Sequence, residues 1–93
     1  MQWFTLSLHD DGLGEASLEL LASARPEQAA SVEAELQALL ADADGLAQAL
    51  GADWQQELQR SKEAGGWFNL HLTLSGPVAW AEQLRARWDA DFS

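Results

Sequence analysis

The sequence predicts an α+β protein of two layers, in which helices cover one face of a three-stranded, mostly antiparallel sheet. In residues 67–74, one face would carry Phe68, Leu70, Leu72 and Leu74 and the other Trp67, Asn69, His71 and Thr73, which is the period of a half-buried β-strand. Residues 3–8 show the same Trp-Phe-x-Leu-x-Leu pattern, and the rest of the chain places apolar residues at helical spacing. Ninety-three residues suffice for one core, so we expect a single domain over residues 1–93.

The first strand is expected over residues 2–9, with its apolar side chains facing the core. Asp11 and Gly12 then favour a turn, because Asp-Gly supplies the positive φ that a tight hairpin needs. Residues 15–22 suit a helix by their Ala, Glu and Leu content, and suit a strand by placing four apolar side chains on one face. We favour the strand, because the turn indicates a hairpin and a two-stranded sheet alone is marginal.

Two helices are expected next. The first covers residues 26–41, beginning at Pro26, whose fixed φ suits a first turn, and ending at the helix-breaking segment 42–45. The second covers residues 46–63, where large apolar side chains recur in steps of four. These side chains are Leu46, Leu50, Trp54 and Leu58.

Gly65 and Gly66 then lead into the strand over residues 67–74. Because this strand and the first one share a pattern, we expect the two to occupy equivalent positions in the middle of the sheet. The last helix is expected over residues 76–90, with Ser75 as its N-cap, and all helices should pack on the apolar face of the sheet.

The charge is strongly acidic and unevenly distributed. The net charge is −10, and residues 1–59 hold eleven acidic residues and one basic residue, whereas residues 60–93 hold four of each. This charge disfavours binding to nucleic acid or to an anionic membrane, and it allows a basic partner protein. The candidate acidic surface lies on the first predicted helix and the segment after it. Its residues are Glu27, Glu33, Glu35, Asp42 and Asp44.

Composition also bears on location. The chain has no cysteine, which excludes disulfides and is compatible with a reducing compartment. No apolar run approaches the roughly 20 residues that span a bilayer, and the N-terminus lacks the features of a signal peptide. We therefore expect a cytoplasmic protein.

The polar face of the sheet is the first candidate binding site. If the two patterned strands are neighbours, their outward side chains form one surface, in which indoles stack a ring and polar groups bind its edges. The competing interpretations are an ordinary solvated face, or a face covered by another chain. The candidate residues are Trp3, Thr5, His9, Trp67, Asn69 and His71.

No arrangement in the sequence favours catalysis, a metal ion or a cofactor. His9, Asp10 and Asp11 with His71 offer metal-ligand atoms, but they lack the local spacing of a zinc site, so solvated histidines are the better interpretation. The chain has no nucleophilic cysteine, no Gly-x-Ser-x-Gly motif and no glycine-rich phosphate loop. We expect a protein that is not an enzyme.

The last helix supplies a second candidate site. Its apolar stripe of Trp80, Leu84, Trp88 and Phe92 drifts around the helix, because steps of four exceed the 3.6-residue period. The sheet buries only part of such a stripe, so Trp88 and Phe92 are expected to stay partly exposed and to form a hot spot for a partner. The alternative is that they pack locally onto another tryptophan.

Three functions follow from these observations. The leading hypothesis is a non-enzymatic protein-interaction module, such as a small acidic inhibitor, immunity or adaptor-like protein, that uses its acidic surface or its aromatic sheet face. The second is a domain that binds a small molecule or peptide on the Trp/His face. The third is a structural homo-oligomer, a homodimer in the simplest case, in which two open sheet faces pack together.

Overall fold

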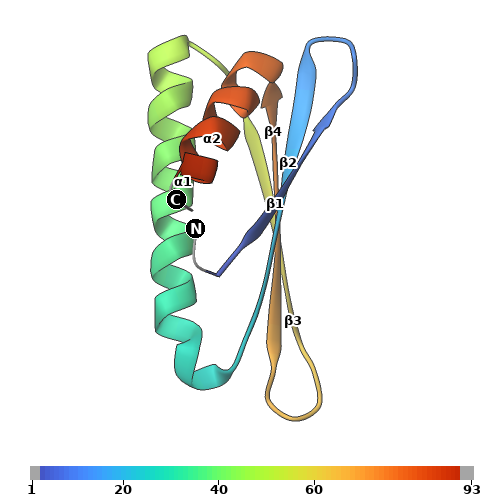
Figure 1. The fold of residues 1–93 in the computed structure, drawn as a ribbon, viewed down its shortest axis with the longest axis vertical. Coiled ribbons are helices and arrows are strands. Elements are labelled where there is room, and N and C mark those ends of the chain that lie inside the picture. Colours follow the sequence, from blue (N-terminus) through green and yellow to red (C-terminus); the bar gives the residue numbers. More distant parts are fainter. Residues whose placement is uncertain (1–2, 91–93) are drawn as a thin grey trace.

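The computed structural model describes residues 3–90, which form one four-stranded antiparallel sheet with two α-helices against it (Figure 1). The predicted α+β class and two layers are confirmed, and the predicted number of three strands is wrong. The elements are β1 (Thr5–Asp10), β2 (Glu15–Ala24), the 3₁₀ turn η1 (Pro26–Gln28), α1 (Ala29–Leu50), β3 (Gln55–Lys62), β4 (Phe68–Pro77) and α2 (Val78–Ala90).

The strand order across the sheet is β1-β2-β4-β3, and every neighbouring pair is antiparallel. The strand predicted over residues 15–22 is therefore correct, and β2 extends two residues further, to Ala24. It separates the two patterned strands, so the expectation that those strands are neighbours in the middle of the sheet is wrong. β1 forms one edge, while β2 and β4 occupy the centre.

The hairpin between β1 and β2 is built by two aspartates, as the Asp-Gly sequence predicts. Asp10 Oδ1 accepts a hydrogen bond from the backbone N–H of Gly12 at 2.8 Å. Asp11 Oδ1 accepts from Leu13 and Glu15 at 2.7 and 3.1 Å. These side-chain bonds satisfy backbone donors that the tight turn leaves unpaired, which is why Asp is favoured there.

The helix predicted over residues 46–63 is wrong. α1 continues through the supposed break at residues 42–45 and ends at Gly51, which adopts φ 65° and ψ 32°. A left-handed glycine closes helices without a Cβ clash, so Gly51 rather than Gly45 is the stop signal. The chain then forms β3, an edge strand in which only Leu58 is half-buried. Because its other side chains are exposed, the sequence of β3 lacks the alternation of apolar and polar residues that identifies a strand.

β4 ends three residues later than predicted, and α2 begins two residues later. β4 runs to Pro77, so Ser75 lies inside the strand, opposite Ser17 and Gln55, and does not cap the helix. α2 then begins at Val78, whose backbone N–H donates to the carbonyl of Gly14 at 2.9 Å. This bond fastens the start of α2 to the β1–β2 hairpin.

The two halves of the chain form an internal structural repeat of hairpin and helix. Leu6 pairs with Leu20, and 52 residues further along the chain (6 to 58, 20 to 72) Leu58 pairs with Leu72. Leu20 and Leu72 also pair with each other, which places an approximate two-fold axis between them. The shared Trp-Phe-x-Leu-x-Leu pattern does not follow this repeat, because it occurs in β1, an edge strand, and in β4, a central strand.

The contact between each helix start and the neighbouring hairpin follows the same repeat. Gly14 bonds to Val78, and their counterparts 52 residues away, Gly66 and Pro26 (14 to 66, 26 to 78), also lie together. A Cβ built on Gly66 would lie 3.7 Å from Cγ of Pro26. The repeat therefore extends from the sheet to the starts of both helices.

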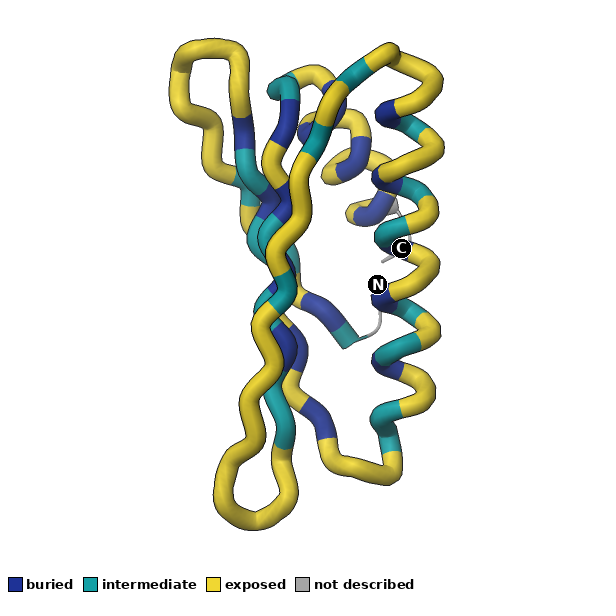
Figure 2. The backbone as a smooth tube through the Cα atoms, turned by 180° about the vertical axis from the view of Figure 1, so that it is seen from behind, coloured by how far each residue is buried: buried dark blue, intermediate teal, exposed yellow. Residues whose placement is uncertain are grey.

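The core lies between the sheet and the helices, where the buried positions of Figure 2 gather, while both hairpin tips are exposed. Every second residue of β2 and β4 is buried, as alternation predicts. No helix in residues 3–90 is long and apolar enough to cross a bilayer. The largest buried side chains are Phe4, Leu18, Leu20, Val32, Leu36, Leu70, Leu72, Leu74, Trp80, Leu84 and Trp88.

Candidate functional site

Both helices pack on the same side of the sheet, which leaves the opposite side uncovered (Figure 1). We call this uncovered side the outer face. It is four strands wide, and it carries the odd-numbered side chains of every strand, because successive side chains of a strand point to opposite sides. Its residues are Thr5, Ser7, His9, Ser17, Glu19, Leu21, Ser23, Gln55, Glu57, Gln59, Ser61, Asn69, His71, Thr73 and Ser75.

The middle of the outer face consists of two rows that run across the strands. In the first row, Leu21 lies between Thr5 and His71, and Gln59 lies beyond His71. Leu21 is 50% exposed, so a large apolar side chain stands open to solvent among hydrogen-bonding groups. An exposed aliphatic side chain at the centre of a polar face provides the apolar contact that interfaces use.

The second row is acidic. It runs Ser7, Glu19, Thr73, Glu57, so that two carboxylates flank one threonine. Like charges in one row repel each other across the face. A cationic side chain placed over Thr73 would relieve that repulsion.

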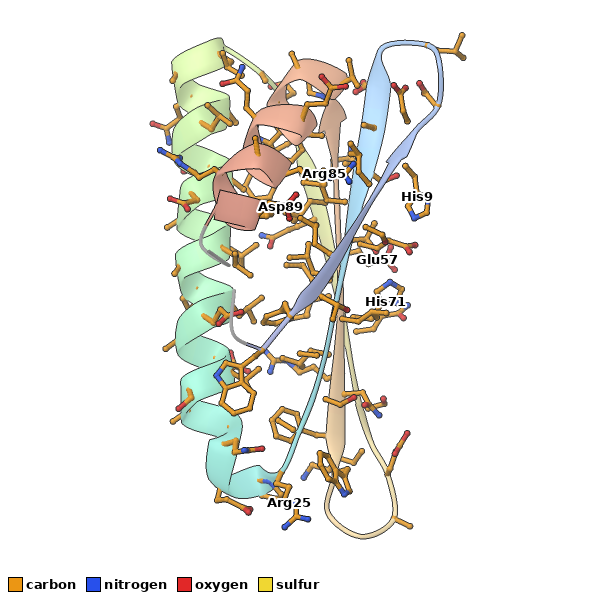
Figure 3. The ribbon with its side chains drawn as sticks, viewed as in Figure 1. His9, Arg25, Glu57, His71, Arg85 and Asp89 are labelled. Carbon is orange, nitrogen blue, oxygen red and sulfur yellow. The ribbon has the colours of Figure 1, made fainter. Side chains whose placement is uncertain are left out.

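Two histidines lie beside Glu19, and Figure 3 shows both labelled histidines on the outer face with Glu57. His9 Nε2 lies 3.4 Å from one carboxylate oxygen of Glu19, and His71 Nε2 lies 4.0 Å from the other. The 4.0 Å separation is too long for a hydrogen bond, and His71 Nε2 is buried without a partner within the described residues. His9 also lies 3.4 Å from Ser7 Oγ.

These groups do not form a metal site. Within residues 3–90, no set of three or more His, Cys, Asp or Glu side chains converges as metal ligands do. The cluster is therefore better described as a polar network with one unsatisfied atom, His71 Nε2. An unsatisfied buried atom carries a free-energy penalty that an incoming hydrogen-bonding group removes.

Trp67 lies beside Arg25, which Figure 3 shows at the η1 end of the molecule. It is 40% exposed, and the guanidinium of Arg25 lies 5.2 Å from its ring centroid, in the range of a cation–π contact. Between this pair and His71, Ser23 donates a hydrogen bond to Asn69 across the β2–β4 pair. The outer face thus continues from the imidazoles to an indole.

The structure brings together five of the six residues predicted for the sheet face, with β2 inserted between their strands. Thr5, His9, Asn69 and His71 lie on the outer face, and Trp67 lies at its end. Trp3 lies elsewhere, because it precedes β1 and packs against the core, on the side of the helices. Its backbone N–H donates to Glu35 Oε1 at 3.0 Å.

A shallow hollow of about 730 Å³ crosses the outer face between β2, β4 and β3. Its outward-facing lining consists of Leu21, Ser23, Gln59, Ser61, Asn69 and His71. Sequence reasoning missed Leu21 and the whole contribution of β3. Leu21 follows directly after buried Leu20, so the run of two leucines hid the alternation that places it outside.

Most carboxylates of the predicted acidic surface have partners within the protein, and these partners lie on different elements. Glu33 pairs with Arg60 on β3, and Glu35 accepts the backbone N–H groups of residues 3 and 4 at 3.0 and 3.3 Å. Asp44 accepts from Gln48 within α1 at 2.8 Å. Glu27 lies exposed on η1. Glu33, Glu35 and Asp44 are thus engaged within the protein, while Glu27 faces solvent.

Asp42, the fifth residue of the predicted acidic surface, contacts Trp88. The prediction that Trp88 stays partly exposed is wrong. Trp88 is 1% exposed, and its indole N–H donates to Asp42 Oδ2 at 3.2 Å. Arg87 approaches the other oxygen of Asp42 at 3.8 Å. α1 covers the part of the α2 stripe that the sheet leaves open, so Trp88 is buried between two helices. Phe92 lies outside the described residues.

Searches against protein-family models, curated proteins and solved structures each found no match to this chain.

Proposed function

We propose that this protein is a non-enzymatic protein-interaction module that binds a partner protein through the outer face of its sheet. The single observation that supports this most is that a four-stranded sheet keeps one entire face free of helices. A face of four strands about 4.8 Å apart and ten residues of about 3.3 Å each spans on the order of 600 Å². A typical stable interface takes about 800 Å² from each partner, so the face is close to the required size.

The composition of the face also supports this proposal. Leu21 and Trp67 supply apolar and aromatic contact area, and the surrounding hydroxyl, amide and imidazole groups supply hydrogen bonds. The hollow is shallow and open, which suits the complementary surface of a protein better than enclosure of a reacting molecule. An inhibitor, immunity or adaptor-like role is consistent with recognition of this kind.

The partner that best fits this face is one with a basic side chain at its centre. Glu19 and Glu57 place two carboxylates on either side of Thr73, and the whole chain carries a net charge of −10. A lysine or arginine between these carboxylates forms charge-assisted hydrogen bonds. The same charge speeds the encounter with a basic partner at low salt.

The test is capture of a partner from the native lysate by immobilised protein, followed by mass spectrometry and measurement of the affinity of the purified partner. Leu21→Ser should weaken binding roughly tenfold, because it removes the central apolar contact. Leu13→Ser is the matched control, since Leu13 is 87% exposed in the β1–β2 turn, away from the outer face. Equal loss in both variants, or no loss in either, contradicts the proposal.

A second pair of variants tests the charge. Glu57→Gln should weaken binding about twofold to fivefold at low salt and less at high salt, because exposed charges are screened. Glu27→Gln removes the same charge from η1 and should leave the affinity unchanged. If the two variants behave alike, the partner responds only to net charge and the proposed role of the outer face in recognising the basic group is wrong.

A further inference from the structure

A pocket of about 500 Å³ lies on the other side of the sheet, at the η1 end of the molecule. The start of α1 forms one wall, through Pro26 and Ala29, and the inner side of β4 forms the floor, through Phe68 and Leu70. Arg60 and Lys62 of β3 also line the pocket, together with Glu33 of α1, whose carboxylate is paired with Arg60. The pocket is thus an apolar recess whose charged lining is two basic side chains and one paired carboxylate. It lies on the helical side of the sheet and shares Arg60, Ser61 and Leu70 of β3 and β4 with the hollow of the outer face.

The internal repeat explains why this end is hollow. At the opposite end, Trp80 of α2 fills the layer between helix and sheet, where it is fully buried and its indole N–H donates to the carbonyl of Ala43 at 2.9 Å. The residue 52 positions earlier is Gln28 (28 to 80). Its side chain accepts the backbone N–H of Arg25 at 3.0 Å, within the turn that starts η1. No indole therefore occupies the equivalent space.

The charge around the pocket differs from that of the rest of the chain. Three of the five basic residues, Arg25, Arg60 and Lys62, lie at this end, although the protein as a whole is strongly acidic. Arg60 is paired with Glu33, and the hydrogen bond to Glu33 raises the pKa of its guanidinium above its usual value. Lys62 has no carboxylate within 4.0 Å among residues 3–90, so its ammonium is available to an anion.

We propose that this pocket binds a small amphipathic carboxylate, with its apolar chain on Phe68 and Leu70 and its carboxylate on Lys62. A pocket of this volume lies within the range of small-molecule sites, and an apolar recess with one directing charge is their usual chemistry. The ammonium binds the carboxylate as a point charge, while Arg60 adds hydrogen-bond donors at the rim. This proposal does not depend on the proposed protein partner.

The experiment is a titration of the full chain with sodium decanoate, followed by calorimetry and by the NMR shifts of backbone amides. Decyltrimethylammonium is the matched probe, because it has the same apolar chain and the opposite charge. We expect saturable binding of decanoate, shifts concentrated in residues 60–70 and around Ala29, and no saturable binding of the cation. Absence of saturable decanoate binding, or equal binding of both probes, overturns the proposal.

Three variants locate the site. Lys62→Met keeps most of the apolar stem and removes the charge, and it should raise the Kd for decanoate roughly fivefold or more. Arg85→Met removes a positive charge from α2 instead, at a residue paired with Asp89, and should leave the Kd unchanged. Ala29→Phe fills the recess from the half-exposed start of α1 and should abolish binding. An unchanged Kd in Lys62→Met overturns the proposal, even if Ala29→Phe does not fold.

Discussion

At the scale of single residues, the buried tryptophans of α2 show how this small core combines large apolar area with satisfied polar atoms. Trp80 and Trp88 are both buried, and each indole N–H has an acceptor on α1, the carbonyl of Ala43 and the carboxylate of Asp42. A buried indole without an acceptor would lose much of the gain from burial. The same two bonds hold α2 against α1.

Gly76 shows the tightest packing around Trp80. A Cβ at position 76 would lie 2.7 Å from Cε3 of Trp80 and 3.3 Å from Cβ of Trp54. The ring of Trp80 has no room to retreat, because it is buried on all sides and tilted against Trp54 at a centroid distance of 5.7 Å. Only glycine fits at this position of β4.

We therefore predict that Gly76→Ala lowers the free energy of unfolding by about 2 kcal/mol or more, as overpacked cores do. Urea denaturation followed by tryptophan fluorescence measures this change. The control is the double variant Gly76→Ala with Trp80→Phe, because the smaller ring frees space for the new methyl group. The two losses should be less than additive by about 1 kcal/mol. Strict additivity would show that the clash with Trp80 is not the cause.

At the scale of elements, α1 is continuous over Ala29–Leu50 and is closed by a left-handed glycine. The helix contains Gly45, which has open space around its Cα, whereas Gly51 has φ 65° at the C-terminal end. Gly45 thus lies in the helix interior, where a residue with a side chain fits, whereas Gly51 has a left-handed backbone that favours glycine. This difference gives a test of where the helix ends.

Gly45→Ala should raise the free energy of unfolding by about 0.5–1 kcal/mol, because alanine favours a helix interior over glycine. Gly51→Ala should lower it by about 1–2 kcal/mol, because a Cβ is strained in the left-handed conformation. Thermal or urea denaturation of both variants measures the two changes. Destabilisation by Gly45→Ala would indicate that the helix ends near residue 45, as the segment 42–45 suggests from sequence.

The sequence was most informative where alternation was clean and least informative at an exposed edge. The strand at 67–74 is correct because its apolar residues all face one core, and the Asp-Gly turn identifies the first hairpin. β3 was mistaken for a helix because an edge strand with one half-buried side chain has no alternation, while Trp54 and Leu58 happen to lie four residues apart. Pairing with β4, rather than local pattern, makes it a strand.

The candidate site was predictable only in part for a related reason. The outward positions of β4 follow from its alternation, so the sequence alone places Asn69 and His71 on the face opposite the core. Which strands lie beside β4 depends on the strand order, and that order brings Leu21, Glu19 and Glu57 into the site. Trp88 was misjudged because its burial depends on α1, which lies far from it in sequence.

At the scale of the whole molecule, the two halves meet at an approximate two-fold axis, and their helices cover the same side of one sheet. One side of the sheet thus packs against the helices and forms the core, and the other side, the outer face, is not covered by a helix. The open side combines Leu21 with the carboxylates of Glu19 and Glu57. This arrangement suits a basic partner better than a second copy of the chain.

We accordingly predict that the protein alone is a monomer of 10.1 kDa in solution. A symmetric dimer through the outer face with its axis near Thr73 would place Glu19 and Glu57 of one copy against the same two carboxylates of the other, and both copies carry a charge of −10. Multi-angle light scattering at low salt measures the mass. A mass near twice the monomer value that falls after Leu21→Ser would support the homo-oligomer instead.

The most direct test of the outer face is an NMR titration of ¹⁵N-labelled protein with the captured partner. We predict that the largest changes in amide shift occur in β2 and β4 around Leu21, His71 and Thr73, with smaller changes in β3 and almost none in α1. Changes concentrated in α1 and α2, with β2 and β4 unaffected, would contradict binding at the outer face and would show that the partner binds the helical side.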